Sequence, residues 1–369
     1  KGEIKDEPQL IYYGLVGQNA HATMDGTTRS VGSLFMGVQL QCAQCHDDPY
    51  RDWAQQEFWA MAGFFNSMTG DFGRIRTRET GGELSIPHSA FKNTGKRVTL
   101  GYLHGKPQDA KRKADWRPDF TKWLTQRDNP FFARAFANRV WFQLFTRGIV
   151  HPVDDIRALN PPTHPGLLNL LANEFAASGF DVKHLLRCIC NSQTYQRTSR
   201  GKGEAQQAAF GRAPMRVMTA DMLLESLKLA YNDPKLDLRT HDKDSGNTNG
   251  ESAAVGDPYM EFHRRFATNE EDTTDFTHGI PQMLTFINHP RLRSISEGGK
   301  VMEDFLKKHP DLEPAPIIER LYLSTLSRRP TAEESAESVA YTAACDEPAQ
   351  AYTDVLWMLV NRSEFLFVR

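Results

Sequence analysis

Apolar residues recur at helical spacing over most of this chain, and this periodicity restricts the possible fold more than any other feature. Before Cys42, for example, Val31, Leu34 and Val38 share one face of a helix. Predicted helices run from Thr27 or Thr28 to Cys42, Trp53 to Phe65, Asn129 to Gly148, Thr163 to Gly179, Asp181 to Ile189, Asp221 to Tyr231, onward from a capping box at Thr331–Glu334, and through Val355–Val360. The sequence therefore predicts a mainly α, multi-helical fold.

The helical pattern is interrupted around residues 70–116. Arg74, Ile75 and Arg76 alternate between polar and apolar, which is typical of a strand. A glycine pair follows at 81–82, and residues 98–103 again favour a strand. We expect a small β or irregular excursion in this region.

The length of 369 residues suggests two or three domains. We expect a linker over residues 1–26, a region with the cysteine motif over 27–116, and a helical partner domain over 117–369. A cluster of Asp, Ser, Asn and Gly without periodicity predicts a flexible insert at about 233–258.

Charge and composition exclude several classes of protein. The 44 Lys and Arg residues balance 46 Asp and Glu, giving a net charge of −2, which disfavours a dedicated nucleic-acid binder. No stretch approaches the roughly 18 apolar residues of a membrane span. The chain starts at Lys1 without a charged and then apolar leader, so we expect a signal peptide to have been removed or to lie upstream.

One motif carries recognisable chemistry. Cys42, Cys45 and His46 form the pattern C-x-x-C-H, by which c-type haem is attached. Two thiols three residues apart can each add to a vinyl group of the porphyrin, and the adjacent imidazole can bind the iron. The motif predicts covalent haem c, with His46 as the proximal iron ligand.

Three other interpretations of the cysteines remain open. Cys42 and Cys45 could join Cys188 and Cys190 in a four-ligand zinc site. They could be a thioredoxin-like redox pair, although a helix and not a strand is predicted before them, or a structural disulfide or free thiol pair. We expect Cys188, Cys190 and Cys345 to be buried as small apolar side chains.

An electron-transfer haem needs a second axial ligand, whereas an open position would permit ligand chemistry. By residue type we rank His88 and Met68 ahead of Met61. The remaining candidates of suitable type are Met24, Met36, His21 and His104.

A single haem occupies only part of such a chain, so we also considered its densest polar cluster, which comprises Asn138, Arg139, His151, Asp154, Asp155, Arg157, Asn160 and His164. These groups could form a substrate pocket with acid or base character, with Arg139, His151, Asp154, Asp155 and His164 as candidate catalytic residues. We favour a structural role, in which the two aspartates cap helices or pair with Arg139 and Arg157.

Two sets of segments resemble a planctomycete cytochrome-like family of paired domains of unknown function. The first set comprises Phe35–His46, Pro49, Trp53 and Phe64–Phe65. The second comprises Asn129–Ala135, Asn138–Trp141, Leu144–Phe145, Arg147–Gly148, Pro152–Asp155, Asn160–Pro162, His164–Pro165, Tyr195–Gln196 and Ser363–Leu366. The resemblance implies a haem-bearing secreted or periplasmic protein and supports Cys42, Cys45 and His46 as the haem site.

The chain departs from that family directly after the motif. Similar proteins commonly continue Cys-His-x-His-Pro-Phe, whereas this chain has Asp48 and Tyr50 at the second histidine and the phenylalanine. Any role of that second histidine is therefore lost or altered here.

Taken together, the sequence favours an exported monohaem c-type protein that transfers electrons to a redox partner protein. A haem-dependent oxidoreductase with a pocket near Arg139 and Asp154 is one alternative. A non-redox scaffold protein with zinc or no metal at the cysteine pair is the other.

Overall fold

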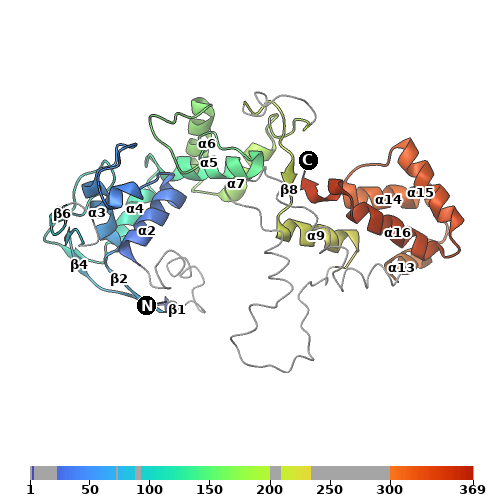
Figure 1. The fold of residues 1–369 in the computed structure, drawn as a ribbon, viewed down its shortest axis with the longest axis horizontal. Coiled ribbons are helices and arrows are strands. Elements are labelled where there is room, and N and C mark those ends of the chain that lie inside the picture. Colours follow the sequence, from blue (N-terminus) through green and yellow to red (C-terminus); the bar gives the residue numbers. More distant parts are fainter. Residues whose placement is uncertain are drawn as a thin grey trace, which may run out of the picture. The chain divides into compact units, whose positions relative to one another are not determined.

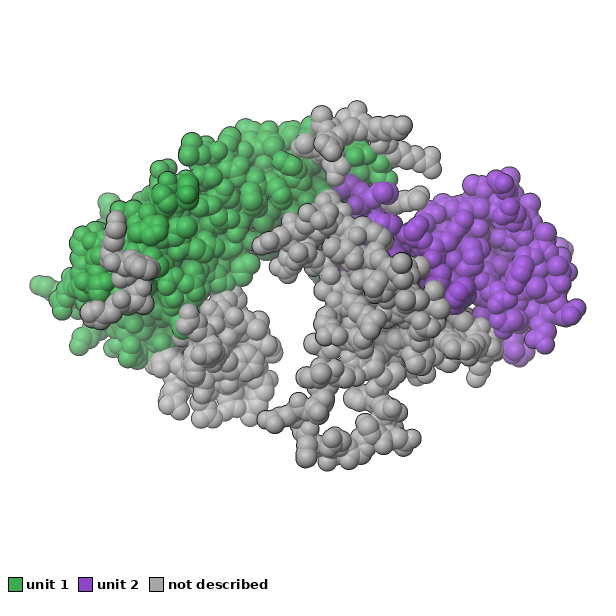
Figure 2. Space-filling model, viewed as in Figure 1, with its two compact units in different colours: residues 1–213 green, residues 214–369 purple. Residues whose placement is uncertain are grey.

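The computed structural model describes residues 2–3, 23–71, 74–87, 93–199, 209–233 and 300–368. The chain divides into two compact units, residues 1–213 and 214–369, which Figure 2 colours green and purple. The described residues are mainly helical with small antiparallel sheets, as predicted (Figure 1). Among them, no helix combines the length and the apolar character needed to cross a membrane.

The first unit begins with helix α2 (Met24–Val31) and a π-helical turn, η2 (Gly32–Met36). Its N-cap is Thr23, whose side chain accepts a hydrogen bond from Gly26 N. The predicted cap at Thr27 or Thr28 was wrong, because both lie inside the helix and are fully buried. The prediction that this helix continues to Cys42 was also wrong, because the chain turns at Gly37, with φ +67°.

Helix α3 (Gln55–Ala62) and the short 3₁₀ helix η4 (Gly63–Phe65) confirm the helix predicted from Trp53. The ring of Phe64 stacks on Tyr102 at 4.9 Å between centroids and packs edge-on against Trp116. This aromatic core places α3 against the β segments that follow it.

The predicted excursion at 70–116 is confirmed as a set of short antiparallel strands. The strands of this region are β2 (Met68–Asp71), β3 (Arg74–Thr77), β4 (Thr80–Gly81), β5 (Glu83–Ser85), β6 (Arg97–Thr99) and β7 (Lys113–Ala114). A short strand from the start of the chain, β1 (Gly2–Glu3), pairs with β3. The pairing order is β1-β3-β2, β4-β7 and β5-β6.

Four helices complete the first unit: α4 (Arg117–Leu124), α5 (Phe132–Phe145), α6 (Pro165–Ala177) and α7 (Val182–Cys190). Asn129 accepts hydrogen bonds from the backbone N–H groups of Phe131 and Phe132 at the start of α5. Asp181 caps α7 through His184 N, as predicted. Helices α5, α6 and α7 pack around a shared apolar core (Figure 1).

Gly37 fastens the segment before the motif to these helices. Its carbonyl accepts a hydrogen bond from Ile156 N at 2.9 Å. A β-carbon at Gly37 would lie 2.7 Å from Ile156 Cδ1 and 3.1 Å from Ala135 Cβ, so only glycine permits this approach. We expected a boundary between a motif region (27–116) and a helical partner domain (117–369). The structure instead places residues 27–116 and the partner domain up to residue 213 in one compact unit.

The second unit contains α9 (Ala220–Ala230), α13 (Lys300–Lys308), α14 (Pro314–Leu326), α15 (Ala332–Ala344) and α16 (Pro348–Val360). The 3₁₀ helix η5 (Ser363–Leu366) leads into β9 (Phe367–Val368), which pairs with β8 (Arg216–Val217). The capping box of Thr331 and Glu334 and the buried stripe of α16 are both confirmed. The predicted insert lies outside the described residues beyond Asp233, as does most of the predicted linker.

Candidate functional site

The C-x-x-C-H motif forms a single helical turn. Cys42 to Gln44 is a 3₁₀ helix, η3, and the N–H groups of Cys45 and His46 both bond to Cys42 O, at 3.3 and 3.4 Å. The three motif side chains are all half-buried, and both thiols are free. The motif is thus a short turn after Gly37 and not the end of a long helix.

Helix α3 fixes this turn through its backbone carbonyls. Gln55 Nε2 donates to Cys45 O at 2.8 Å, and Trp59 Nε1 donates to Gln44 O at 3.0 Å. Both donors are buried, with 0% and 1% of their surface exposed. Buried hydrogen bonds of this kind strongly favour one backbone conformation. The cysteines are therefore presented on a rigid support.

Helix α2 holds the turn from its other side. Gln44 Nε2 donates to Asp25 Oδ2 at 2.9 Å, and Arg29 donates to Gln44 Oε1. Arg29 also pairs with Asp25 along the helix. The two residues between the cysteines are thus used for anchoring, since Ala43 is fully buried.

His46 has one ring nitrogen engaged locally. Its Nδ1 lies 2.7 Å from the carbonyl oxygen of Asp47, a contact that requires the proton on Nδ1. Among the described residues Nε2 has no hydrogen-bond partner, so it is the ring nitrogen available to a metal. Backbone carbonyl partners of this kind commonly orient metal-binding histidines.

Asp48 shapes the chain after the motif. Its Oδ1 accepts hydrogen bonds from Tyr50 N at 2.9 Å and Arg51 N at 3.1 Å, which makes an Asx turn. The Asp48 side chain is 1% exposed and its Oδ2 lies 3.6 Å from an Arg51 nitrogen. The second position after the motif is therefore a buried aspartate that organises the turn.

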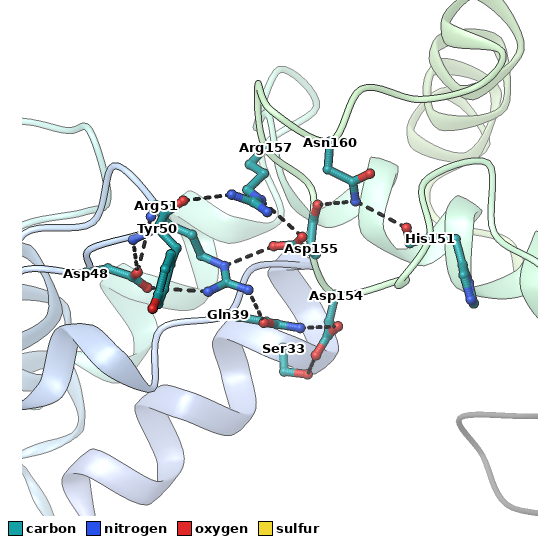
Figure 3. A network of polar contacts seen from close by, with 10 residues as sticks. All are labelled: Ser33, Gln39, Asp48, Tyr50, Arg51, His151, Asp154, Asp155, Arg157 and Asn160. Carbon is teal, nitrogen blue, oxygen red and sulfur yellow. Dashed lines mark hydrogen bonds and ion pairs between the residues drawn. The ribbon is translucent and has the colours of Figure 1, made fainter.

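Arg51 is the centre of a polar network shown in Figure 3. Its Nε donates to Asp155 Oδ1 at 2.9 Å, and another of its nitrogens donates to Gln39 Oε1. Burial acts to lower the pKa of Arg51, but the hydrogen bond and charge of Asp155, with smaller contributions from Asp48 and Cys42, raise it above its ordinary value. The arginine is a fixed positive charge beside the motif.

The loop after Val150 supplies the other side of this network. Asp154 accepts from Ser33 Oγ at 3.0 Å and from Gln39 Nε2 at 2.9 Å. Arg157 donates to Asp155 Oδ2 at 3.0 Å and to Tyr50 O at 2.7 Å. The loop and the motif segment are thereby joined by charged and neutral hydrogen bonds (Figure 3).

The predicted polar cluster is only partly brought together. Asp155 pairs with Arg157, but Arg139 does not pair with either aspartate and donates instead to Ser33 O at 3.2 Å. The ring of His151 stacks near Phe142, with 6.0 Å between centroids, and points away from the network in Figure 3.

Two further members of that cluster have separate structural contacts. Asn138 is fully buried and bonds both N–H and C=O of Val150. His164 lies against Phe210 and Thr163.

The sequence reasoning missed the three residues of the motif segment that complete the network, Ser33, Gln39 and Arg51. Arg51 contacts Asp155, which lies 104 positions away in the sequence, and no local sequence pattern predicts such a pair. Only the spacing of Asp48 and Arg51, three residues apart, gave a weak signal of an ion pair.

The axial-ligand candidates lie in different settings. Met61 and Met36 are fully buried in the core of the first unit, and Met68, at the start of β2, is 8% exposed. His104 stacks on Trp53 at 4.9 Å. His88 and His21 lie outside the described residues.

The four-cysteine zinc site is not formed. All five cysteines are described and free, and among the described residues no group of three or more His, Cys, Asp or Glu is placed to hold a metal ion. The expectation that the remaining cysteines are buried was wrong, since Cys188 is exposed and Cys190 and Cys345 are half-buried. The buried residues of α7 are Leu185 and Ile189, whereas Leu186 and Cys188 lie outside this buried stripe and are exposed.

Comparison with known families matches two segments of the chain. A family model described as "PSCyt2: Protein of unknown function (DUF1549)" matches residues 15–70, and one described as "PSD1: Protein of unknown function (DUF1553)" matches residues 116–342. No curated protein and no solved structure matches the chain. The paired domains of unknown function expected from the resemblance are confirmed. Because the second match covers more than half of the 369 residues, the chain belongs to the PSD1 family of proteins of unknown function (DUF1553).

Proposed function

We propose that this protein carries one covalently bound haem c on Cys42, Cys45 and His46 and transfers single electrons to a partner protein. The observation that carries the proposal is the geometry of one turn: two free, half-buried thiols at i and i+3, followed directly by an imidazole whose Nδ1 contacts a backbone carbonyl. The donor set fits haem c, which needs one protein imidazole and two thiols and not a cluster of three metal ligands.

The residues around the turn have defined roles in this proposal. Cys42 and Cys45 would form the thioether bonds, and His46 would bind the iron through Nε2 while Asp47 O holds its other ring nitrogen. A bound haem supplies a one-electron couple to such a site. Gln55 and Trp59 keep the turn in one conformation, which reduces the reorganisation on electron transfer.

Location follows from the same chemistry. Attachment of haem c requires export and a maturation system, so we place the protein in the periplasm or outside the cell. The proposed location therefore depends on the presence of covalent haem.

The alternative of a substrate pocket near Arg139 and Asp154 has less support. Asp154 uses both carboxylate oxygens on Ser33 and Gln39, and Asp155 is held between Arg51 and Arg157. These contacts serve to join two segments of the chain, and the network accounts for the charges without a ligand.

The test is production of the full chain with export in a host competent for cytochrome c maturation. We expect a haem-stained band on a denaturing gel, a pyridine haemochrome spectrum of the c type, and about one iron per chain. The double variant Cys42→Ser/Cys45→Ser should lose the stained band, whereas the matched control Cys345→Ser should keep it.

Two outcomes would overturn the proposal. One is a folded, exported protein with no covalent haem in that host; the other is native protein that contains zinc in place of iron. Addition of cyanide or carbon monoxide to the haem protein then separates the two redox hypotheses. An electron carrier with two strong axial ligands resists both, whereas an oxidoreductase with an open position binds them.

A further inference from the structure

Helix α7 presents a thiol and an imidazole side by side on the surface of the first unit. Cys188 Sγ lies 3.5 Å from His184 Nε2, at the i, i+4 spacing that places two side chains on one face of a helix. Cys188 is exposed, and the His184 side chain is 39% exposed. The pair is open to solvent and to dissolved reagents.

Two carboxylates lie close to His184. Glu174, from helix α6, brings its Oε2 to 3.9 Å from the same Nε2 atom. Asp181 at the N-cap adds a second negative charge, and its pKa is lowered first by its hydrogen bond to His184 N, with His184 and Arg187 charges contributing less. The carboxylates are well exposed, so solvent screens their effect.

We propose that Cys188 is a modification site, which reacts with low-molecular-weight disulfides by thiol–disulfide exchange. His184 Nε2 accepts the proton of the thiol, and Cys188 Sγ attacks one sulfur of the disulfide. A new S–S bond forms while the reagent's S–S bond breaks, and the leaving thiolate takes the proton back from His184. The protein thiol is oxidised to a mixed disulfide, and the reagent is reduced to one free thiol.

The other two cysteines outside the motif serve as internal comparisons. Cys190 lies on the same helix but is half-buried. Cys345 is also half-buried and hydrogen-bonds through its side chain with Tyr341. Among these three thiols, Cys188 is the one that combines exposure with an imidazole partner, so the reaction should be selective.

The experiment measures reaction of the full chain with glutathione disulfide at neutral pH, followed by mass spectrometry of tryptic peptides. Cys188 and Cys190 fall in one tryptic peptide, so the assay uses a Cys190→Ser background to isolate Cys188. Because each peptide is scored separately, the result does not depend on whether Cys42 and Cys45 carry haem.

We expect Cys188 to react about tenfold faster than Cys345, and His184→Gln to slow Cys188 by about tenfold, because the variant removes the base that accepts the thiol proton. Lys183→Gln removes a neighbouring charge without touching the thiol and should change the rate by less than about twofold. Circular dichroism confirms that each variant folds. Equal rates at Cys188 and Cys345, or no effect of His184→Gln, would overturn the proposal.

Discussion

Both units are held by an arginine that bridges two carboxylates, but the two networks serve different purposes. In the first unit Arg51 lies between Asp48 and Asp155. In the second, Arg328 bonds Glu334 at 2.7 and 2.8 Å and Glu364 at 2.9 and 3.0 Å. The chemistry is the same, a guanidinium fork on carboxylates.

The networks differ in sequence separation and in burial. Arg51 and Asp155 are 104 residues apart and join a segment matched by one family model to a segment matched by the other. Arg328 reaches residues 6 and 36 positions away, within one unit and around the start of α15. The Arg51 side chain is 16% exposed and that of Arg328 is 28% exposed. The first network joins the segments matched by the two family models, whereas the second joins residues that are close in the sequence within one unit.

The largest expected effect comes from Arg51→Met. The substitution leaves buried Asp48 without a cation and Asp155 with Arg157 alone, and breaking buried pairs in this way costs about 3 kcal/mol. Urea unfolding followed by tryptophan fluorescence measures the loss, because five of the six tryptophans belong to the first unit. Arg51→Lys keeps the charge but not the fork, and should recover part of the stability. A loss below about 1 kcal/mol for Arg51→Met would show that the Arg51 ion pairs contribute no more than pairs at the protein surface.

Asp155→Asn and Asp154→Asn form a matched pair of adjacent, near-isosteric changes. Asp155 bonds two arginines, so its neutralisation should cost about 2 kcal/mol. Asp154 accepts from the neutral groups of Ser33 and Gln39, so its replacement should cost about 0.5 kcal/mol. The same fluorescence assay measures the loss of unfolding free energy for each variant. A larger loss for Asp154→Asn than for Asp155→Asn would contradict the central role of the Arg51 ion pairs in this network.

Arg328→Met tests the second network. We expect a loss of about 1.5 kcal/mol, because the site is more exposed and Glu334 keeps Arg362 as a partner at 2.7 Å. Far-ultraviolet circular dichroism during urea unfolding follows the helices of both units, whereas tryptophan fluorescence mainly follows the first, so the variant should shift the circular dichroism transition and change the fluorescence transition little. An effect as large as that of Arg51→Met would remove the distinction between the networks.

The smallest effect is a dependence on pH. The hydrogen bond from Arg328 lowers the pKa of Glu334, opposed by burial and assisted by Thr331 N and Arg362. A carboxyl group with a lowered folded-state pKa stabilises the fold above its ordinary value of 4.5, and this contribution is lost as the pH falls.

We therefore expect the stability difference between the wild type and Glu334→Gln, about 1 kcal/mol at pH 7, to narrow steadily below pH 4.5. Urea unfolding of both proteins from pH 7 to pH 3 measures it. A gap that widens on acidification would refute the assignment of the low pKa to Glu334.

Local signals predicted much of the fold. The caps at Asp181 and Thr331 start helices where the sequence placed them, because each side chain bonds a backbone N–H three residues ahead. The motif turn was not predicted as a separate element, although its backbone hydrogen bonds span only three or four residues. The end of the first helix at Gly37 was not predictable, because the glycine is required by contacts with Ile156 and Ala135, far along the chain.

The candidate site also combines features set by nearby residues, which could be predicted, with features set by distant contacts, which could not. The spacing of Cys42, Cys45 and His46 could be interpreted from chemistry alone. The network around Arg51 could not be predicted from the sequence. A charged residue at the surface and a charged residue in a buried ion pair have the same residue type, so the sequence does not distinguish them. Separations of about a hundred residues are set by tertiary packing, which periodicity and propensity do not encode.

The long reach of the Arg51 network also imposes an order in time. A ribosome adds about 5–20 residues per second, so the 104 residues from Arg51 to Asp155 take on the order of 5–20 s to make. Throughout that interval Gly37 O lacks Ile156 and Arg51 lacks Asp155, although Cys42 and Cys45 have already been synthesised. The two thiols therefore exist first in an unfinished environment, open to reagents in solution before the fold closes around the turn.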